Sequence, residues 1–235
     1  MTDQPNPFAS PQTDAGESAT NTPGVPYSES YRSTQSLGQS LRRIYWVLFA
    51  LSVAFVPAQA YSLATVNQAW ASPNITPIDT VFMALGVAFL VAMIVLLFAF
   101  CRWKYRSYAN LRAFGVEDTR MTPRWAVGYY FIPIVNLYMP FRAMKDIING
   151  SAGKPVETGV GFVTLWWTMH VLSGVAESTA GRMEFSATTL AAAQSAELFG
   201  LVGSVLTVIA LPLEIRVIRE ADKRQLAAAR AAGIE

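Results

Sequence analysis

The sequence contains one cysteine and one histidine, and only 14% of its 235 residues are charged. A single cysteine, Cys101, cannot form an internal disulfide. One histidine and one cysteine also exclude the common metal-ligand clusters and the His-dependent catalytic triads. We therefore expect no metal, no cofactor and no enzymatic activity. An average soluble domain is about 25% charged, so the scarcity of charge points to another class of protein.

The few charged residues are unevenly placed and leave long uncharged windows. Residues 44–64 and 80–101 carry no charged side chain over 21 and 22 positions. A bilayer core of about 30 Å needs about 20 apolar residues of helix. Three further windows, 125–141, 160–176 and 198–213, are also uncharged. Together with a hydrophobic content of 52% and a mean hydropathy of +0.31, the windows predict an all-α integral membrane protein.

Residues 1–40 have a different composition from the rest of the chain. They include five prolines and many Ser, Thr and Asn residues, with few large aliphatic side chains. Such a segment cannot bury enough apolar surface to offset the entropy lost on ordering. No basic patch followed by a short apolar core lies near Met1, so a signal peptide is not expected. We predict a disordered N-terminal tail over residues 1–40.

The placement of Lys and Arg decides how many windows cross the membrane. Short cytoplasmic loops collect these residues. If residues 125–141 do not cross, 17 of the 18 Lys and Arg residues lie on one side and only Arg182 lies on the other. If they do cross, the split is 10 to 8. The strong bias predicts four spans, at about 44–64, 80–101, 160–177 and 197–214, with both termini cytoplasmic. The transmembrane domain then covers residues 41–228, and 229–235 form a C-terminal tail.

The stretch at 125–141, WAVGYYFIPIVNLYMPF, is broken by two prolines. Pro133 removes the helical hydrogen-bond partner of the Tyr129 carbonyl, and Pro140 does the same to Asn136. In lipid, such freed groups cost several kcal/mol unless protein or water satisfies them. We therefore predict a re-entrant or interfacial broken helix between the second and third spans.

The helix expected at residues 103–114, just after the second span, has two distinct faces. At 100° per residue, every third or fourth side chain falls on the same stripe. One stripe combines hydrogen-bond donors with aromatic rings, and the other combines a lysine, a tyrosine and a leucine. Their members are Trp103, Arg106, Asn110 and Phe114 on the first stripe, and Lys104, Tyr108 and Leu111 on the second.

The first stripe is suited to contact backbone carbonyls that have no hydrogen-bond donor. Our hypothesis is that Arg106 and Asn110 hydrogen-bond to carbonyls freed around Pro133 and Pro140, with Asn136 nearby. The alternative is a solvated basic helix beside anionic headgroups on the cytoplasmic side, where each Lys or Arg is worth about 1 kcal/mol.

Two motifs in this region carry a family resemblance. The first is W-x-x-R-x-x-x-N-L, and P-x-W-x-x-G-x-x-x-x-P-x-x-N-L-x-x-P follows it. In this order they resemble a bacterial multi-pass membrane family known as domain of unknown function 4328, over roughly residues 40–228. The resemblance implies a location in the bacterial plasma membrane and brings no established activity. Where the family pattern often has a basic residue, this chain has Met139. The candidate cluster is Trp103, Arg106, Asn110, Pro123, Trp125, Gly128, Pro133, Asn136 and Pro140.

Polar residues inside spans are costly and often functional. His170 lies on one helical stripe with Glu177, and Glu197 opens the last span at a similar outer depth. One interpretation is a protonatable group of His170, Glu177 and Glu197 lining a small cavity. The other places both glutamates among the outer headgroups and His170 in a hydrogen bond between helices.

Two weaker patterns complete the sequence picture. Small residues recur at packing spacing at 84, 88 and 92 and at 196, 200 and 204, which favours close packing within the bundle. A homodimer seam is the alternative. The C-terminal helix carries i, i+4 pairs of opposite charge, which favours a solvated helix.

Three classes of function agree with these observations. The first is a non-enzymatic scaffold or regulator that works through protein or lipid partners at the cytoplasmic face, and we favour it. The second is a small transporter or channel-forming oligomer that uses the broken segment. The third, an intramembrane enzyme, has the least support, because no nucleophile with an acid–base pair is visible. Nothing suggests nucleic-acid binding.

Overall fold

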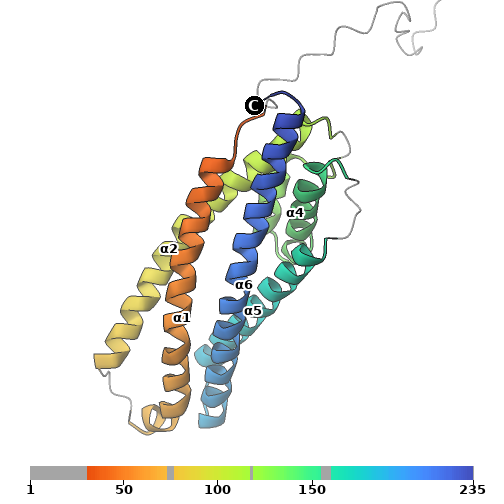
Figure 1. The fold of residues 1–235 in the computed structure, drawn as a ribbon. Helices are drawn as coiled ribbons and strands as arrows, with labels where there is room; N and C mark the ends of the chain where they lie inside the picture. The colour runs from red at the N-terminus through yellow and green to blue at the C-terminus, as the bar shows by residue number, and fades with distance from the viewer. Residues whose placement is uncertain (1–30, 73–76, 117–118, 155–159, 235) are drawn as a thin grey trace, which may run out of the picture.

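The computed structural model describes residues 31–72, 77–116, 119–154 and 160–234. The described residues are all-helical, with six α-helices and two short 3₁₀ turns (Figure 1). The α-helices are α1 (Gln35–Ala71), α2 (Pro77–Ala113), α3 (Pro123–Gly128), α4 (Met139–Gly150), α5 (Gly161–Ser186) and α6 (Leu190–Ala231). The turns η2 (Tyr129–Phe131) and η3 (Val135–Leu137) lie between α3 and α4.

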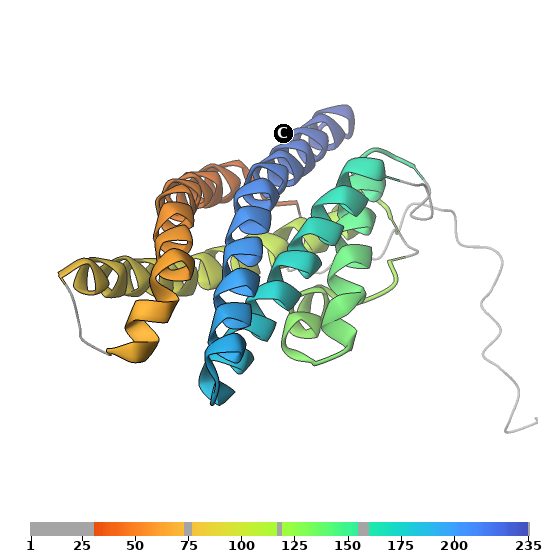
Figure 2. The same cartoon turned by 90° about the horizontal axis from the view of Figure 1, so that it is seen from below.

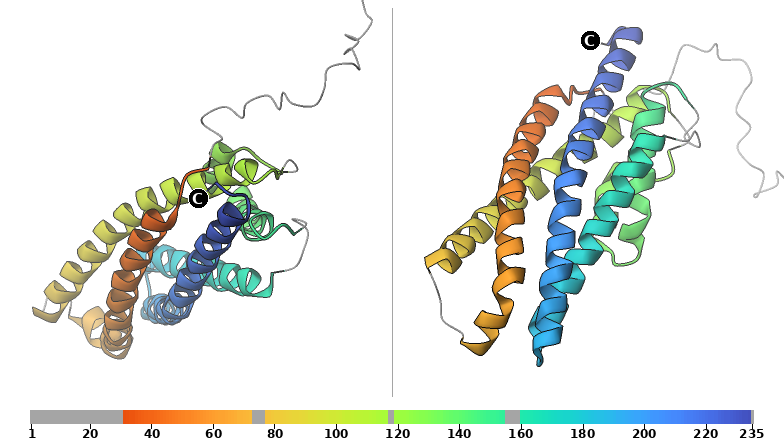
Figure 3. Two further views of the ribbon diagram at one scale, coloured as in Figure 1. Left: turned by 45° about the horizontal axis from the view of Figure 1, so that its top comes forward. Right: turned by 60° about the horizontal axis from the view of Figure 1, so that its bottom comes forward.

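The four long helices run up and down and define two ends of the bundle. We call the end where α1 begins and α6 finishes the terminal end. The opposite end, where α1 leads to α2 and α5 leads to α6, is the hairpin end (Figure 1). Seen from below, α1, α6 and α5 follow one another, α4 lies beyond α5, and α2 crosses behind α6 (Figure 2). Towards the hairpin end, α2 stays beside α1 and diverges from α5 and α6 (Figure 3).

Among the described residues, three helices are long and apolar enough to cross a membrane, namely α1, α2 from Asp79 onwards, and α6. This indicates a membrane protein. The fourth long helix, α5, has 26 residues, so it has the length to span as well. Its polar side chains, including His170 and Glu177, reduce its hydropathy, and it is not among the three.

The apolar core is confined to the terminal half of the bundle. Its buried members on α1 end at Leu48, and those on α2 start at Leu96. On α5 they end at Trp167, and on α6 they start at Leu211. Beyond these levels the long helices leave most of their large apolar side chains exposed. Exposed apolar side chains are what a lipid environment requires of spanning helices.

The ends of the ordered helices differ from the boundaries that composition predicted. The first helix begins at Gln35, inside the stretch 1–40 assigned to a disordered tail, while residues 1–30 lie outside the described residues. The last helix continues to Ala231, past the boundary expected at 228. The predicted break between 125 and 141 is present, as α3, η2, η3 and α4 in succession.

Candidate functional site

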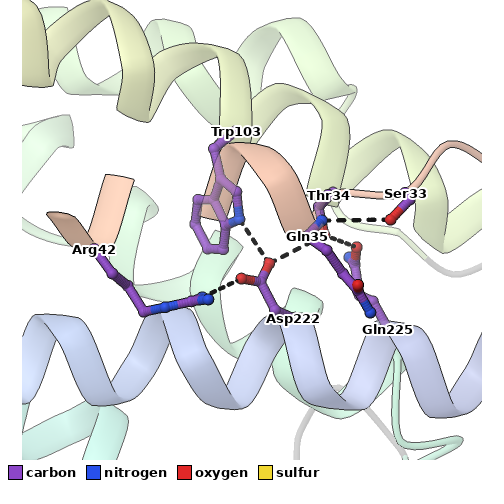
Figure 4. Close-up of polar contacts among 7 residues, drawn as sticks. All are labelled: Ser33, Thr34, Gln35, Arg42, Trp103, Asp222 and Gln225. Carbon is purple, nitrogen blue, oxygen red and sulfur yellow. Dashed lines mark hydrogen bonds and ion pairs between the residues drawn. The ribbon is translucent and has the colours of Figure 1, made fainter. Parts of the chain in front are cut away.

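A buried carboxylate, Asp222 of α6, joins three parts of the chain at the terminal end (Figure 4). It accepts hydrogen bonds from the indole Nε1 of Trp103 at 2.9 Å and from the hydroxyl of Thr34 at 3.1 Å. It also forms an ion pair with Arg42 of α1. Burial raises the pKa of Asp222, while the bonds from Trp103 and Arg42 act in the opposite direction. The carboxylate therefore ties the start of α1 and the end of α2 to α6.

A glycine makes this arrangement sterically allowed. Gly38 lies on the buried face of α1, and a Cβ atom there would overlap the carboxylate of Asp222. The helices can approach closely only because position 38 has no side chain. The sequence gives no obvious sign of this role.

Next to Asp222, Gln225 and Asn110 form an amide pair. The Gln225 side chain donates to the carbonyl of Ser107 at 2.6 Å and accepts from Asn110 Nδ2 at 3.0 Å. Asn110 also donates to the carbonyl of Arg32 at 2.9 Å and accepts from its backbone N–H at 3.1 Å. The two amides thus hold the residues that precede α1 against α2 and α6.

The second stripe of residues 103–114, in the last turns of α2, contacts the broken segment (residues 125–141) and α4. The Lys104 side chain is fully buried, and its Nζ donates to the carbonyl of Pro140 at 3.3 Å and lies 3.4 Å from the hydroxyl of Tyr130. One turn on, the hydroxyl of Tyr108 donates to Asp146 of α4 at 2.9 Å. Burial raises the pKa of Asp146, and the bond from Tyr108 and the nearby Arg120 act against the increase.

The hypothesis that Arg106 and Asn110 satisfy the broken segment is therefore wrong. Asn110 is occupied by Arg32 and Gln225. Arg106 is half-buried and makes no hydrogen bond to residues 129–140 in the part of the chain that the structure describes. The physical reason is rotation, because Lys104 and Tyr108 lie on the stripe that faces α4, whereas Trp103 and Asn110 face α6.

The broken segment itself is held by protein groups. Thr122 accepts from the backbone N–H of Trp125 at the start of α3, and Pro123 occupies the first position of that helix. The ring of Trp125 stacks on Tyr129, with centroids 5.0 Å apart. The carbonyl of Leu137 accepts from the indole of Trp167 at 2.9 Å, as the carbonyl of Pro140 accepts from Lys104. Two carbonyls of this segment thus receive hydrogen bonds from side chains of the neighbouring helices α5 and α2.

Three other motif residues have local roles in this segment. Gly128 ends α3, Pro133 stands in the non-helical link between η2 and η3, and Asn136 lies within η3. Asn136 also lines a groove that includes His170 and Arg182, and not the cluster around Asp222.

The structure separates the predicted group of His170, Glu177 and Glu197. His170 Nδ1 lies 4.0 Å from the carboxylate of Glu214, which accepts from the hydroxyl of Tyr45 at 2.8 Å. Glu177 instead accepts from Thr207 at 2.6 Å. His170 lines the groove with Asn136 and Arg182, whereas the two glutamates line other cavities.

The two glutamates lie in the hairpin half of the bundle. Glu197 accepts from Gln59 at 3.0 Å. Glu177 and Glu197 line adjacent cavities, and both cavities are also lined by Gln59 and Glu184. The structure thus brings these glutamates near each other while leaving His170 elsewhere.

Sequence reasoning missed the part played by the C-terminal helix. It was predicted to be solvated, but one face is buried, with Glu214, Ile218, Asp222 and Gln225 at helical spacing. This period of three to four residues was present in the sequence and could have predicted a packed face. The i, i+4 pair of Glu220 and Arg224 does form, at 2.7 Å.

Comparison with known proteins supports the resemblance seen in the motifs. The family model "Domain of unknown function (DUF4328)" matches residues 67–223, which is narrower than the range of 40–228 expected from the motifs. No curated protein matches the chain. No solved structure matches it either. The match begins near the end of α1 and includes both motifs and Asp222. Since the match covers more than half of the sequence, the chain belongs to the DUF4328 family.

Proposed function

We propose that this protein crosses the bacterial plasma membrane four times and places its terminal end in the cytoplasm. The fourth span is α5, whose 26 residues extend about 39 Å, more than the bilayer core of about 30 Å. Two of its polar side chains have partners nearby, since His170 lies beside Glu214 and Glu177 is bonded to Thr207. The Lys and Arg bias supports this orientation, with the hairpin end and Arg182 outside.

In this orientation, the protein acts as a non-enzymatic scaffold or regulator through its cytoplasmic face. The observation that carries this proposal is the buried hydrogen-bond network around Asp222, which cross-links α1, α2 and α6. A network in which several buried groups satisfy one another rigidifies the helices that contribute to it. A rigid surface is suited to binding a partner without a large ordering cost.

The terminal end is also closed and rimmed with positive charge. Large side chains with under 2% exposure, including Trp103, Met144 and Ile218, fill its interior. On its outside, Arg102 and Lys223 are exposed and can attract anionic headgroups. Both features support partner and lipid binding at this face more than passage of a solute through it.

A small transporter is the second candidate, because the hairpin half contains an acid-lined cavity of about 290 Å³. Transport would require the terminal end to open. That opening would break the bonds of Asp222 to Trp103 and Thr34. We therefore place this function second.

Site-specific photo-crosslinking in living cells tests the scaffold proposal. A crosslinker at position 102 or 223, at the exposed rim of the terminal end, should capture the same protein partner in repeated experiments. The matched controls are positions 182 and 185 near the hairpin end, where Phe185 is 96% exposed. Adducts that arise only from the controls, or uptake of a solute by purified protein in vesicles, would contradict the proposal.

Reporter fusions test the orientation separately. Reporters after residues 150 and 230 should be cytoplasmic, and reporters after 72 and 185 should be outside. A reporter at 150 that behaves as extracytoplasmic would overturn the four-span arrangement, because residues 125–141 would then cross the membrane.

A further inference from the structure

The hairpin half contains a cavity that the scaffold proposal does not use. Its volume is about 290 Å³, at the lower end of the range of small-molecule sites. All four long helices contribute to its walls. The lining residues important for the argument are Ser52, Phe55, Phe89, Glu177, Glu184 and Thr207.

The charged side chains of the cavity determine which charge a ligand must carry. Glu177 and Glu184 lie two turns apart on α5 and both line the cavity. Among the described residues, no Lys, Arg or His joins them in its walls. Two carboxylates without a basic neighbour in one concave site attract a cation.

Ser52 supplies an independent sign of a missing partner. Its side chain is 4% exposed and lines the cavity, and its hydroxyl has no hydrogen-bond partner in the described structure. Buried polar groups in folded proteins are nearly always hydrogen-bonded. A bound N–H donor would satisfy the free Oγ atom.

The remaining wall is apolar and aromatic. The rings of Phe55 and Phe89 lie with centroids 6.5 Å apart, at an interplanar angle of 45°. Aromatic faces attract organic cations and also cover the hydrocarbon part of such a ligand. A bare metal ion fits less well, because the described residues hold no group of three or more His, Cys, Asp or Glu side chains that could bind one.

Glycines of α6 set the position of two polar side chains near the cavity. A Cβ atom at Gly203 would lie 2.7 Å from Cγ of Glu177, and one at Gly200 would clash with the amide of Gln59. The side chains of Glu177 and Gln59 can pack against α6 only because positions 203 and 200 are glycine. The site is thus formed by close helix packing and does not depend on a flexible loop.

We propose that this cavity binds a small organic cation, a protonated amine attached to an apolar group. Glu177 and Glu184 provide the counter-charge, Ser52 accepts an N–H from the ammonium group, and Phe55 with Phe89 cover the apolar part. The proposal does not depend on the scaffold function, and the two are tested by different experiments.

Titration calorimetry on the full-length protein in lipid nanodiscs provides the test, with benzylamine at neutral pH as the probe. Benzylammonium should bind saturably. The neutral analogue benzyl alcohol, of nearly the same shape, should bind at least about tenfold more weakly, because it lacks the charge. This comparison needs no variant. Equal binding of the two compounds, or no saturable binding of benzylammonium, would overturn the proposal.

Substitutions then locate the site. Glu177→Gln and Glu184→Gln should each weaken benzylammonium binding about tenfold, and Ser52→Ala should weaken it by a smaller factor. The matched control is Glu220→Gln, since Glu220 pairs with Arg224 in the terminal half. Binding that is unchanged in both glutamate variants, while they retain the wild-type melting temperature, would place the amine elsewhere and overturn the proposal.

Discussion

At the terminal end, Trp103, Asp222 and Gln225 are buried and hydrogen-bonded across helices, whereas at the hairpin end Glu177 and Glu184 face a cavity. The apolar core fills only the first of these regions. The same four helices therefore enclose an apolar core at one end and line a cavity at the other.

The proposed four-span arrangement accounts for this contrast, because it places the hairpin half within lipid and lets the terminal half reach into water. Where helices extend into water, apolar burial drives them together, and enclosed polar groups must find partners. Within lipid there is no such drive, so contact relies on small residues and on occasional polar bonds. Gly200 and Gly203 of α6 provide close contacts of this kind in the hairpin half.

The largest effect is expected when the buried carboxylate of Asp222 is removed. Asp222→Ala leaves Arg42 and Trp103 without their buried acceptor and should reduce the free energy of unfolding by about 3–5 kcal/mol. Glu177→Ala, in the hairpin half, should cost about 1 kcal/mol, because it removes one exposed hydrogen bond to Thr207. Chemical unfolding in mixed micelles measures both. Equal losses would show that the two halves do not differ in this way.

A smaller effect is expected when the close helix contact at Gly38 is blocked. Gly38→Ala forces the Asp222 carboxylate to move and should cost about 1–3 kcal/mol. Gly174→Ala on α5 is the control, because a Cβ atom there meets nothing within 4 Å. That variant should be neutral or stabilising by up to about 1 kcal/mol. A stable Gly38→Ala protein with an intact Arg42–Asp222 pair would contradict the expectation.

The smallest effect concerns the broken segment and distinguishes the two stripes of α2. Lys104→Met removes the donor to the carbonyl of Pro140 and should cost about 1–2 kcal/mol. Amide hydrogen exchange across residues 129–140 should increase at the same time. Arg106→Met should leave this exchange unchanged. If Arg106→Met increased this exchange more than Lys104→Met, Arg106 and not Lys104 would be the residue that holds the broken segment.

Much of the fold could be predicted from the sequence, because its signals are local. Uncharged windows predicted the long helices, and Pro133 and Pro140 predicted the break between α3 and α4. The two stripes of residues 103–114 were also assigned correctly as separate faces. These features depend on helical periodicity and backbone chemistry alone.

The partners of those stripes could not be predicted, because they depend on how α2 is rotated against its neighbours. About half a turn of that rotation decides whether Arg106 or Lys104 meets Pro140. The buried role of Asp222 could not be predicted for a different reason. A C-terminal helix with many charged residues favours the interpretation that the helix is solvated. The need for a glycine at position 38 appears only when α1 and α6 are placed together.

The position of Asp222 in α6, far along the chain from its partners, also has a consequence for biosynthesis. Trp103 and Arg42 are translated long before their acceptor, which follows Trp103 by 119 residues. At about 5–20 residues per second, the interval is about 6–24 s. During that time the earlier helices are already made while the buried side chains lack their partner. Synthesis of Asp222 therefore marks the point at which a nascent chain can complete this buried cluster, and a chain that stops short of it keeps an unpaired arginine.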